Sequence, residues 1–194
     1  MTPRPAALLL TPGAGSDRNH PALKAIEAAI APLPTARIDF PYRKAGRRAP
    51  DRAPVLVNCI REEAAVFVAQ SGISPSALAL GGRSMGGRMC SMAVAEGLAA
   101  SALVLISYPL HPPGKPDTLR VDHFSALKVP CLFVSGTKDP FGAPAELERH
   151  AEKIPGPVTH VWIEGGGHDF KRHDDDVAEK VRDWLRGLGR RGAQ

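Results

Sequence analysis

The chain has 194 residues, of which 43% are apolar and 23% charged, a balance typical of one domain with a packed core. This composition excludes a disordered chain, a collagen-like fibre and a coiled coil. The net charge of +5 implies only a general attraction to anions and does not identify a binding partner.

Short apolar runs alternate along the chain with segments of helical periodicity. The first run, residues 6–11, ends at Pro12 and predicts a strand buried on both faces. Pro21 then suits a first helical position, and Leu23, Ile26 and Ile30 recur with helical spacing. The same reasoning predicts strands over residues 6–11, 35–40, 77–80, 102–107, 130–135 and 158–163, and helices over 21–31, 56–71, 88–96, 144–153 and 174–188. Residues 41–54, rich in proline and arginine, are expected to form a loop.

Strands that are apolar throughout and alternate with helices are typical of a mostly parallel sheet covered on both faces. We therefore expect a single α/β domain over residues 1–194, with a sheet of about six strands. Ligands of such sheets bind beyond the carboxyl ends of the strands. Chemistry is therefore expected in the loops that follow the predicted strands.

No apolar run approaches the ~18–20 residues that a membrane helix requires, and none has the form of a signal peptide. We therefore expect a cytoplasmic protein without a membrane partner. The cysteines, Cys59, Cys90 and Cys131, lie at wide spacings inside apolar segments. That pattern favours buried thiols over a disulfide framework or a zinc site.

A G-x-S-x-G pentapeptide at residues 82–86 follows a predicted strand and opens a predicted helix. This is the context of a nucleophile elbow, in which glycines let strand and helix pass closely while the serine hydroxyl projects over the sheet. The pentapeptide alone is a weak signal, because glycine-rich turns between strands and helices also bind phosphate. In this context Ser84 is the candidate nucleophile.

A serine becomes a good nucleophile when a base takes its proton and a carboxylate orients that base. Asp139 follows the predicted strand at 130–135, and His168 follows the one at 158–163. Taken singly, such an aspartate is usually a turn former and such a histidine a surface or core residue. The chain order nucleophile, acid, base favours catalytic roles for all three.

An oxyanion hole requires two N–H donors. Met85, directly after the nucleophile, is one candidate, and Ala14 in the loop after the first strand is the preferred second, with Gly15 as the alternative. The candidate substrate-binding residues are Arg83, Tyr108 and Lys138. The positive charge of Arg83, Lys138 and the loop at 43–52 favours a substrate with a carboxylate or phosphate.

Motif spacing argues against a cofactor and against a metal ion. Arg88-Met89 stands where a phosphate-binding P-loop has Lys followed by Ser or Thr, and Arg18 stands where a dinucleotide fingerprint has Gly. His173 lies beside three aspartates at 174–176, but acidic residues at a helix start already have a capping explanation. We expect neither a cofactor nor a metal.

With Ser84, Asp139 and His168 in this order, the sequence resembles the α/β-hydrolase family over nearly its whole length. Segments 40–42, 46–50, 81–88 and 108–116 are similar to the compact dienelactone-hydrolase-like branch, which includes testis-expressed protein thirty and the hydrolase-like domain of a chromatin NSL-complex subunit. The resemblance implies a three-layer sandwich. It also implies no large lid, because only residues 108–123 occupy the usual insertion region. Dienelactone hydrolase itself uses a cysteine nucleophile, so its reaction is not implied.

The sequence thus predicts a serine hydrolase that converts small ester, thioester or lactone substrates through an acyl-enzyme. The alternative is a hydrolase-like interaction module whose basic loop at 43–52 binds an acidic partner. A broken triad would favour that alternative, and the triad is intact in sequence. Nucleic-acid binding through the same loop is less favoured, since the loop lacks interleaved aromatic residues beyond Tyr42.

Overall fold

Six apolar segments form one parallel sheet in the computed structural model, which describes residues 4–188. The strands are β1 (Ala7–Thr11), β2 (Thr35–Arg37), β3 (Leu78–Arg83), β4 (Ala102–Ile106), β5 (Cys131–Gly136) and β6 (Val158–Ile163). Their spatial order is β2-β1-β3-β4-β5-β6, and every neighbouring pair is parallel. Every residue of β1, β4 and β5 is buried, as expected for strands covered on both faces.

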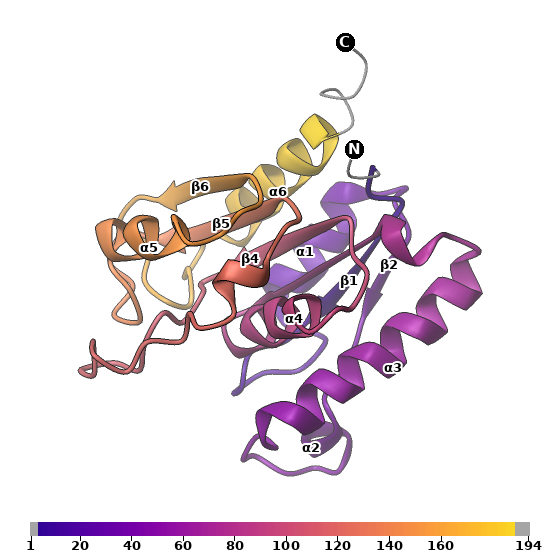
Figure 1. The fold of residues 1–194 in the computed structure, drawn as a ribbon, viewed down its shortest axis with the longest axis horizontal. Coiled ribbons are helices and arrows are strands. Elements are labelled where there is room, and N and C mark those ends of the chain that lie inside the picture. Colours follow the sequence, from indigo (N-terminus) through magenta and orange to yellow (C-terminus); the bar gives the residue numbers. More distant parts are fainter. Residues whose placement is uncertain (1–3, 189–194) are drawn as a thin grey trace.

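Helices cover the two faces of the sheet (Figure 1). The helices α1 (Pro21–Ile30) and α6 (Asp174–Leu188) pack on one face. The helices α3 (Ala53–Ser71), α4 (Met85–Ala95) and α5 (Pro144–Ala151) pack on the other. A short helix, α2 (Pro41–Lys44), precedes α3, and 3₁₀ turns lie at Pro75–Ala77 and Phe124–Ala126.

The helix boundaries follow from local chemistry. Pro21 begins α1, and the preceding His20 side chain accepts a hydrogen bond from the Ala22 N–H at 3.2 Å. Gly72 ends α3 with a φ of 64°, a left-handed conformation that glycine adopts readily. The three aspartates that begin α6 place negative charge at the positive end of the helix dipole. These local signals fix where α1 and α6 begin and where α3 ends.

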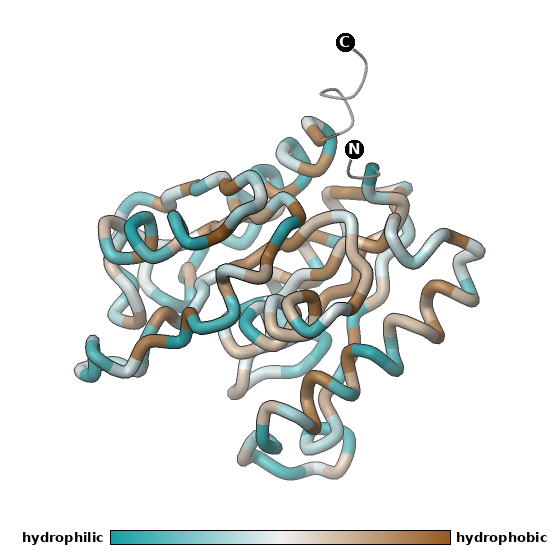
Figure 2. The backbone as a smooth tube through the Cα atoms, viewed as in Figure 1, coloured by the Kyte–Doolittle hydropathy of each residue, from teal (hydrophilic) through white to brown (hydrophobic). Residues whose placement is uncertain are grey.

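Alternate residues of the strands enter two separate cores. Leu9, Leu80 and Phe133 pack beneath α3, α4 and α5, whereas Leu8 and Val104 pack beneath α1 and α6. This is the period-2 alternation of a strand whose two faces are both covered. Hydrophilic residues gather in the projecting loops that follow α2 and β4 (Figure 2).

The predicted fold class is confirmed, with differences at element ends. β2 ends at Arg37 instead of residue 40, because the Asp39 carboxylate accepts a hydrogen bond from the Arg18 N–H and Pro41 begins α2. β3 continues to Arg83 instead of ending at residue 80. Its glycines pair with β1 and β4, and so they belong to the strand as well as to the turn. The segment predicted as a loop at 41–54 contains α2 and the start of α3.

All three cysteines are buried thiols, as predicted. Burial raises the pKa of Cys59 to about 11 and the pKa of Cys90 and Cys131 to about 12, so these groups stay protonated at neutral pH. Between residues 4 and 188, none of the helices combines the length and the apolar character needed to cross a membrane.

A substitution at Phe133 tests the packing of the core beneath α4 and α5. Its buried ring lies 5.7 Å from that of Tyr108 and 6.1 Å from that of Phe124, measured between centroids. Because Phe133→Ala removes buried apolar contacts and leaves a cavity, we expect the free energy of unfolding in urea to fall by ~3–5 kcal/mol. Val66→Ala, at an exposed position of α3, is the control and should change it by less than ~0.5 kcal/mol. Equal changes in the free energy of unfolding for the two substitutions would contradict the packing of Phe133 in this core.

Candidate active site

Ser84 occupies a strained turn between β3 and α4. Its φ of 51° and ψ of −118° lie in a region that non-glycine residues rarely adopt. Neighbouring backbones pass so closely that a Cβ on Gly82 would lie 2.1 Å from Thr11 Oγ1, and one on Gly86 would lie 2.5 Å from the Pro12 carbonyl oxygen. The two glycines of the pentapeptide are therefore required by the packing of β1 against the turn.

Ser84, His168 and Asp139 lie in one hydrogen-bonded row. His168 Nε2 is 2.8 Å from Ser84 Oγ. His168 Nδ1 is 2.8 and 3.0 Å from the two carboxylate oxygens of Asp139. Because an ionised carboxylate only accepts hydrogen bonds, this network assigns the proton to Nδ1 and leaves Nε2 free to accept from the serine hydroxyl. The arrangement can take a proton from Ser84.

Two further contacts hold the row in place. The Asp139 side chain is only 2% exposed, and its Oδ1 also accepts a hydrogen bond from the Phe141 N–H at 2.9 Å. The Phe141 ring stacks on the His168 imidazole with centroids 3.9 Å apart. Phe141 thus positions both Asp139 and His168, a role that the sequence did not indicate.

The loops that carry Asp139 and His168 touch where β5 and β6 end. A Cβ on Gly136 would lie 2.1 Å from the Gly166 carbonyl oxygen, so this contact requires glycine. The Lys138 N–H donates a hydrogen bond to that same oxygen at 2.9 Å. The glycines around the predicted acid and base therefore let the two loops converge on Ser84.

Ala14 and Met85 line the same cavity as Ser84. The Ser16 N–H donates to the Gly13 carbonyl at 3.2 Å and closes a turn around Ala14. The Tyr42 hydroxyl donates to the Ala14 carbonyl at 2.9 Å and fixes the orientation of the following peptide. Among the residues described, no protein acceptor receives a hydrogen bond from the N–H of Ala14, Gly15 or Met85. These amides are available as donors beside the serine.

A cavity of about 480 Å³, which we call the Ser84 cavity, opens over these groups. Its lining residues are Ala14, Gly15, Arg83, Ser84, Met85, Arg88, Pro109, Arg120, Phe141 and His168. The cavity therefore brings together the predicted nucleophile, base and oxyanion donors, with Asp139 directly behind His168.

Of the predicted substrate-binding residues, Arg83 alone lines the Ser84 cavity. Its Nη2 donates to the His168 carbonyl at 2.9 Å, which ties the base to the end of β3. Burial lowers the pKa of Arg83, and the nearby Asp169 and Asp139 oppose that shift. Tyr108 is instead buried, with its hydroxyl donating to the Arg120 carbonyl, and Lys138 is exposed outside the lining. The structure does not place these last two at the cavity.

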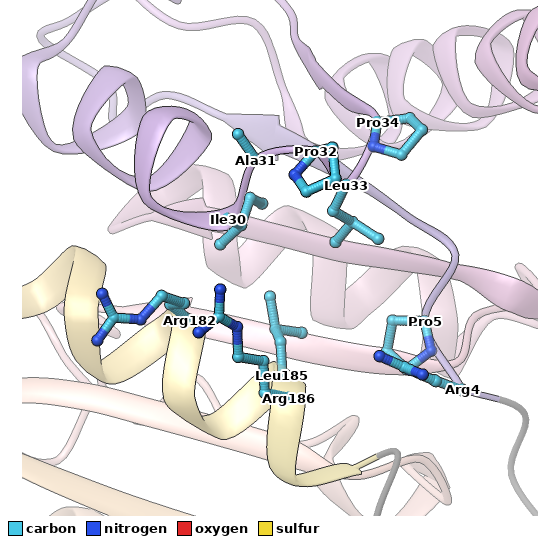
Figure 3. Close-up of a pocket in the computed structure, with 10 residues that line it drawn as sticks. All are labelled: Arg4, Pro5, Ile30, Ala31, Pro32, Leu33, Pro34, Arg182, Leu185 and Arg186. Atoms are coloured by element: carbon cyan, nitrogen blue, oxygen red, sulfur yellow. The ribbon is translucent and has the colours of Figure 1, made fainter.

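A second cavity, of about 330 Å³, lies between the end of α1 and the last turns of α6 (Figure 3). Arg182, Leu185 and Arg186 face Ile30 and the prolines after α1 across it. The residues that line this cavity include neither a nucleophile nor a base. Within residues 4–188, no three His, Cys, Asp or Glu side chains are grouped to hold a metal ion. The Ser84 cavity is therefore the candidate site.

Comparisons with known proteins agree with this architecture. A family described as an alpha/beta hydrolase domain matches the chain over residues 4–186. The chain is similar to a dienelactone hydrolase from Anabaena variabilis, with a TM-score of 0.77 and 19% identity over 95% of this chain and 87% of the other. It is also similar to an alpha/beta serine hydrolase without lid from Xanthomonas campestris, with a TM-score of 0.73 and 19% identity over 96% and 85% of the two chains.

A relative known from sequence covers a smaller region. Epoxide hydrolase A of Mycobacterium tuberculosis is 36% identical over 63 residues. That segment is 32% of this chain and 20% of the epoxide hydrolase.

The contact between His168 and Asp139 can be tested without any substrate. In wild-type protein, the Nδ1 proton of His168 should give a strongly downfield NMR resonance, because a buried carboxylate shares it. Asp139→Asn should remove that resonance, since a neutral amide accepts the proton far more weakly. His150→Gln, on α5, is the matched control and should leave it in place. A resonance that survives in Asp139→Asn would show that the predicted acid does not hold the base.

Proposed function

The chain belongs to the alpha/beta hydrolase family, and from this premise we propose that it is a serine hydrolase of small esters, thioesters or lactones. The single observation that carries the proposal is the 2.8 Å contact between Ser84 Oγ and His168 Nε2. A serine hydroxyl is a weak nucleophile unless a neighbouring base takes its proton. His168 is placed to be that base.

In the acylation step, Ser84 Oγ attacks the substrate carbonyl carbon while its proton passes to His168 Nε2. A tetrahedral intermediate forms, and its oxyanion accepts hydrogen bonds from the N–H groups of Met85 and Ala14. When the intermediate collapses, the bond to the leaving oxygen or sulfur breaks. The imidazolium gives its proton to the leaving group, and the acyl group remains on Ser84.

Deacylation repeats these steps with water as the nucleophile. His168 takes a proton from the water, whose oxygen attacks the acyl carbon, and then returns that proton to Ser84 Oγ as the acid leaves. Asp139 keeps the imidazole in the reactive tautomer and stabilises the imidazolium in both half-reactions. Losing one oxyanion donor from such a site lowers kcat ~10²–10³-fold. The N-terminus of α4 adds positive potential where the oxyanion forms.

The shape of the site supports small substrates. Its cavity of about 480 Å³ lies in the lower half of the ~300–1,000 Å³ typical of ligand pockets. The irregular segment after β4, which reaches the 3₁₀ turn at Phe124–Ala126, contains no helix that would cover Ser84. The similarity to a hydrolase described as having no lid supports the same interpretation.

A fluorophosphonate probe tests the proposal, because it reacts with activated serines. Wild-type protein should acquire one adduct, which peptide mapping places on Ser84. Ser84→Ala should acquire none, and His168→Gln should react ~10²–10⁴-fold more slowly, the usual contribution of a general base. Ser76→Ala, in an exposed turn, is the control and should react as wild type does.

Two outcomes would contradict the proposal that the protein is a serine hydrolase. Folded wild-type protein without an adduct would favour a hydrolase-like interaction module. An adduct that persists in Ser84→Ala would place the reactive group elsewhere.

A further inference from the structure

Two arginines that the sequence analysis did not assign to the site lie beside Ser84 without an anionic partner. Arg88 and Arg120 both line the Ser84 cavity. Among residues 4–188, neither guanidinium forms an ion pair with a carboxylate. Arg88 Nε is also buried without a hydrogen-bond partner. Burial removes water from a guanidinium, and here no carboxylate in the described part of the chain compensates for that loss of hydration. An anion that enters the cavity would therefore stabilise these cations.

The two charges act on the same small volume. Burial lowers the pKa of Arg120, and the Arg88 cation lowers it further. The same cation adds to the effect of burial in lowering the pKa of His123 to about 4. Asp122 and Glu96 oppose that shift, but both are exposed and neither forms an ion pair with Arg88 or Arg120. Arg88 and Arg120 therefore bring positive charge to the lining of the Ser84 cavity.

Hydrogen bonds hold the backbone that carries Arg88 and Arg120. The Arg88 N–H donates to the Ser84 carbonyl at 3.1 Å, which places Arg88 one helical turn beyond the nucleophile. The Arg120 N–H donates to the Leu110 carbonyl at 2.9 Å, and its carbonyl accepts from the Tyr108 hydroxyl at 2.6 Å. Tyr108 thus acts as a positioning residue for Arg120. Because the backbone is already ordered, less conformational entropy is lost when an anion binds.

Among the described residues, Arg83 and three cations of the basic loop have protein partners that Arg88 and Arg120 lack. Arg83 Nη2 donates to the His168 carbonyl, and the guanidinium lies in the field of Asp169 and Asp139, while its Nε, like that of Arg88, is buried without a hydrogen-bond partner. In the loop predicted to attract anions, Arg43 lies 3.7 Å from Asp17 and Arg47 lies 2.8 Å from Asp51, with Lys44 paired to Glu63. Arg43, Lys44 and Arg47 are therefore paired with carboxylates, whereas, over residues 4–188, Arg88 and Arg120 are not.

We propose that Arg88 and Arg120 form a subsite that binds a carboxylate or phosphate group of the substrate. Guanidinium groups suit this role, because their N–H groups match the oxygens of either anion in pairs. An anion held there would place the ester or thioester carbonyl against Ser84, where binding energy is used for orientation. The inference rests on the proposed hydrolase activity and deepens it by naming the substrate class.

The test compares matched nitrophenyl esters. The monoester of glutaric acid ends in a carboxylate, the ester of pentanoic acid is neutral, and a third ester of similar length ends in a phosphonate. After subtraction of spontaneous hydrolysis, wild-type kcat/KM should be ~10-fold or more higher for at least one anionic ester than for the neutral one. The preferred anionic ester distinguishes a carboxylate site from a phosphate site.

The variants Arg88→Gln and Arg120→Gln should each reduce that preference ~10-fold, mainly through KM, because one charge-assisted contact is lost. Arg48→Gln removes the same charge at an exposed position outside the cavity lining and should keep the wild-type preference. Equal kcat/KM for all three esters in wild-type and variant proteins would overturn the subsite.

Direct binding measurements distinguish failure of the anion subsite from failure of the proposed hydrolase activity. Calorimetry should detect glutarate or inorganic phosphate bound to wild-type protein and a ~10-fold weaker Kd for Arg88→Gln. If Ser84 forms the fluorophosphonate adduct but the protein neither prefers anionic esters nor binds anions, the hydrolase proposal is retained and the subsite is rejected. Anion binding without an adduct would reject the hydrolase and retain the anion site.

Discussion

The close passage of β1 and α4 around Ser84 is the constraint on which the site depends. The serine keeps a positive φ, which costs ~1–3 kcal/mol in such conformations. Thr11 and Pro12 stand so near that side chains at positions 82 and 86 would collide with them. The buried strands on either side supply the packing that holds this strained turn. The hydroxyl is consequently fixed at the carboxyl edge of the sheet before any substrate arrives.

Parallel strands bring the remaining groups to the same edge. β5 leads to Asp139, β6 leads to His168, and β1 leads to the turn around Ala14, so three loops distant in sequence meet over Ser84. Glycine contacts between the loops and the Phe141 stack set their spacing. Preorganisation of this kind lets dipoles act on developing charge without having to reorient. The positions of Asp139, His168 and the turn around Ala14 thus follow from the topology of the sheet.

Local sequence patterns were sufficient to predict the strands, most helices and the three residues in the row. Those features depend on periodicity, on glycine spacing and on chain order. The ends of β2 and β3 depend on tertiary contacts, such as the bond from the Arg18 N–H to Asp39, which no local pattern contains. Composition also could not show that two cations of the basic loop, Arg43 and Lys44, are paired with acids distant in sequence.

Charge and polarity in the sequence do not distinguish a residue in a cavity from one that supports it. Tyr108 carries a polar group suited to binding, yet its hydroxyl is used to hold Arg120. Arg88 lies four positions after the nucleophile, and that helical spacing was the one available signal for it.

The proposed catalytic geometry is tested most directly by a crystal structure of the protein after reaction with a phosphonate inhibitor. We expect a covalent bond between phosphorus and Ser84 Oγ, with the phosphonyl oxygen within hydrogen-bond distance of the Met85 and Ala14 N–H groups and His168 beside the serine. A phosphonyl oxygen turned away from those amides, or an inhibitor bonded to any other residue, would contradict it.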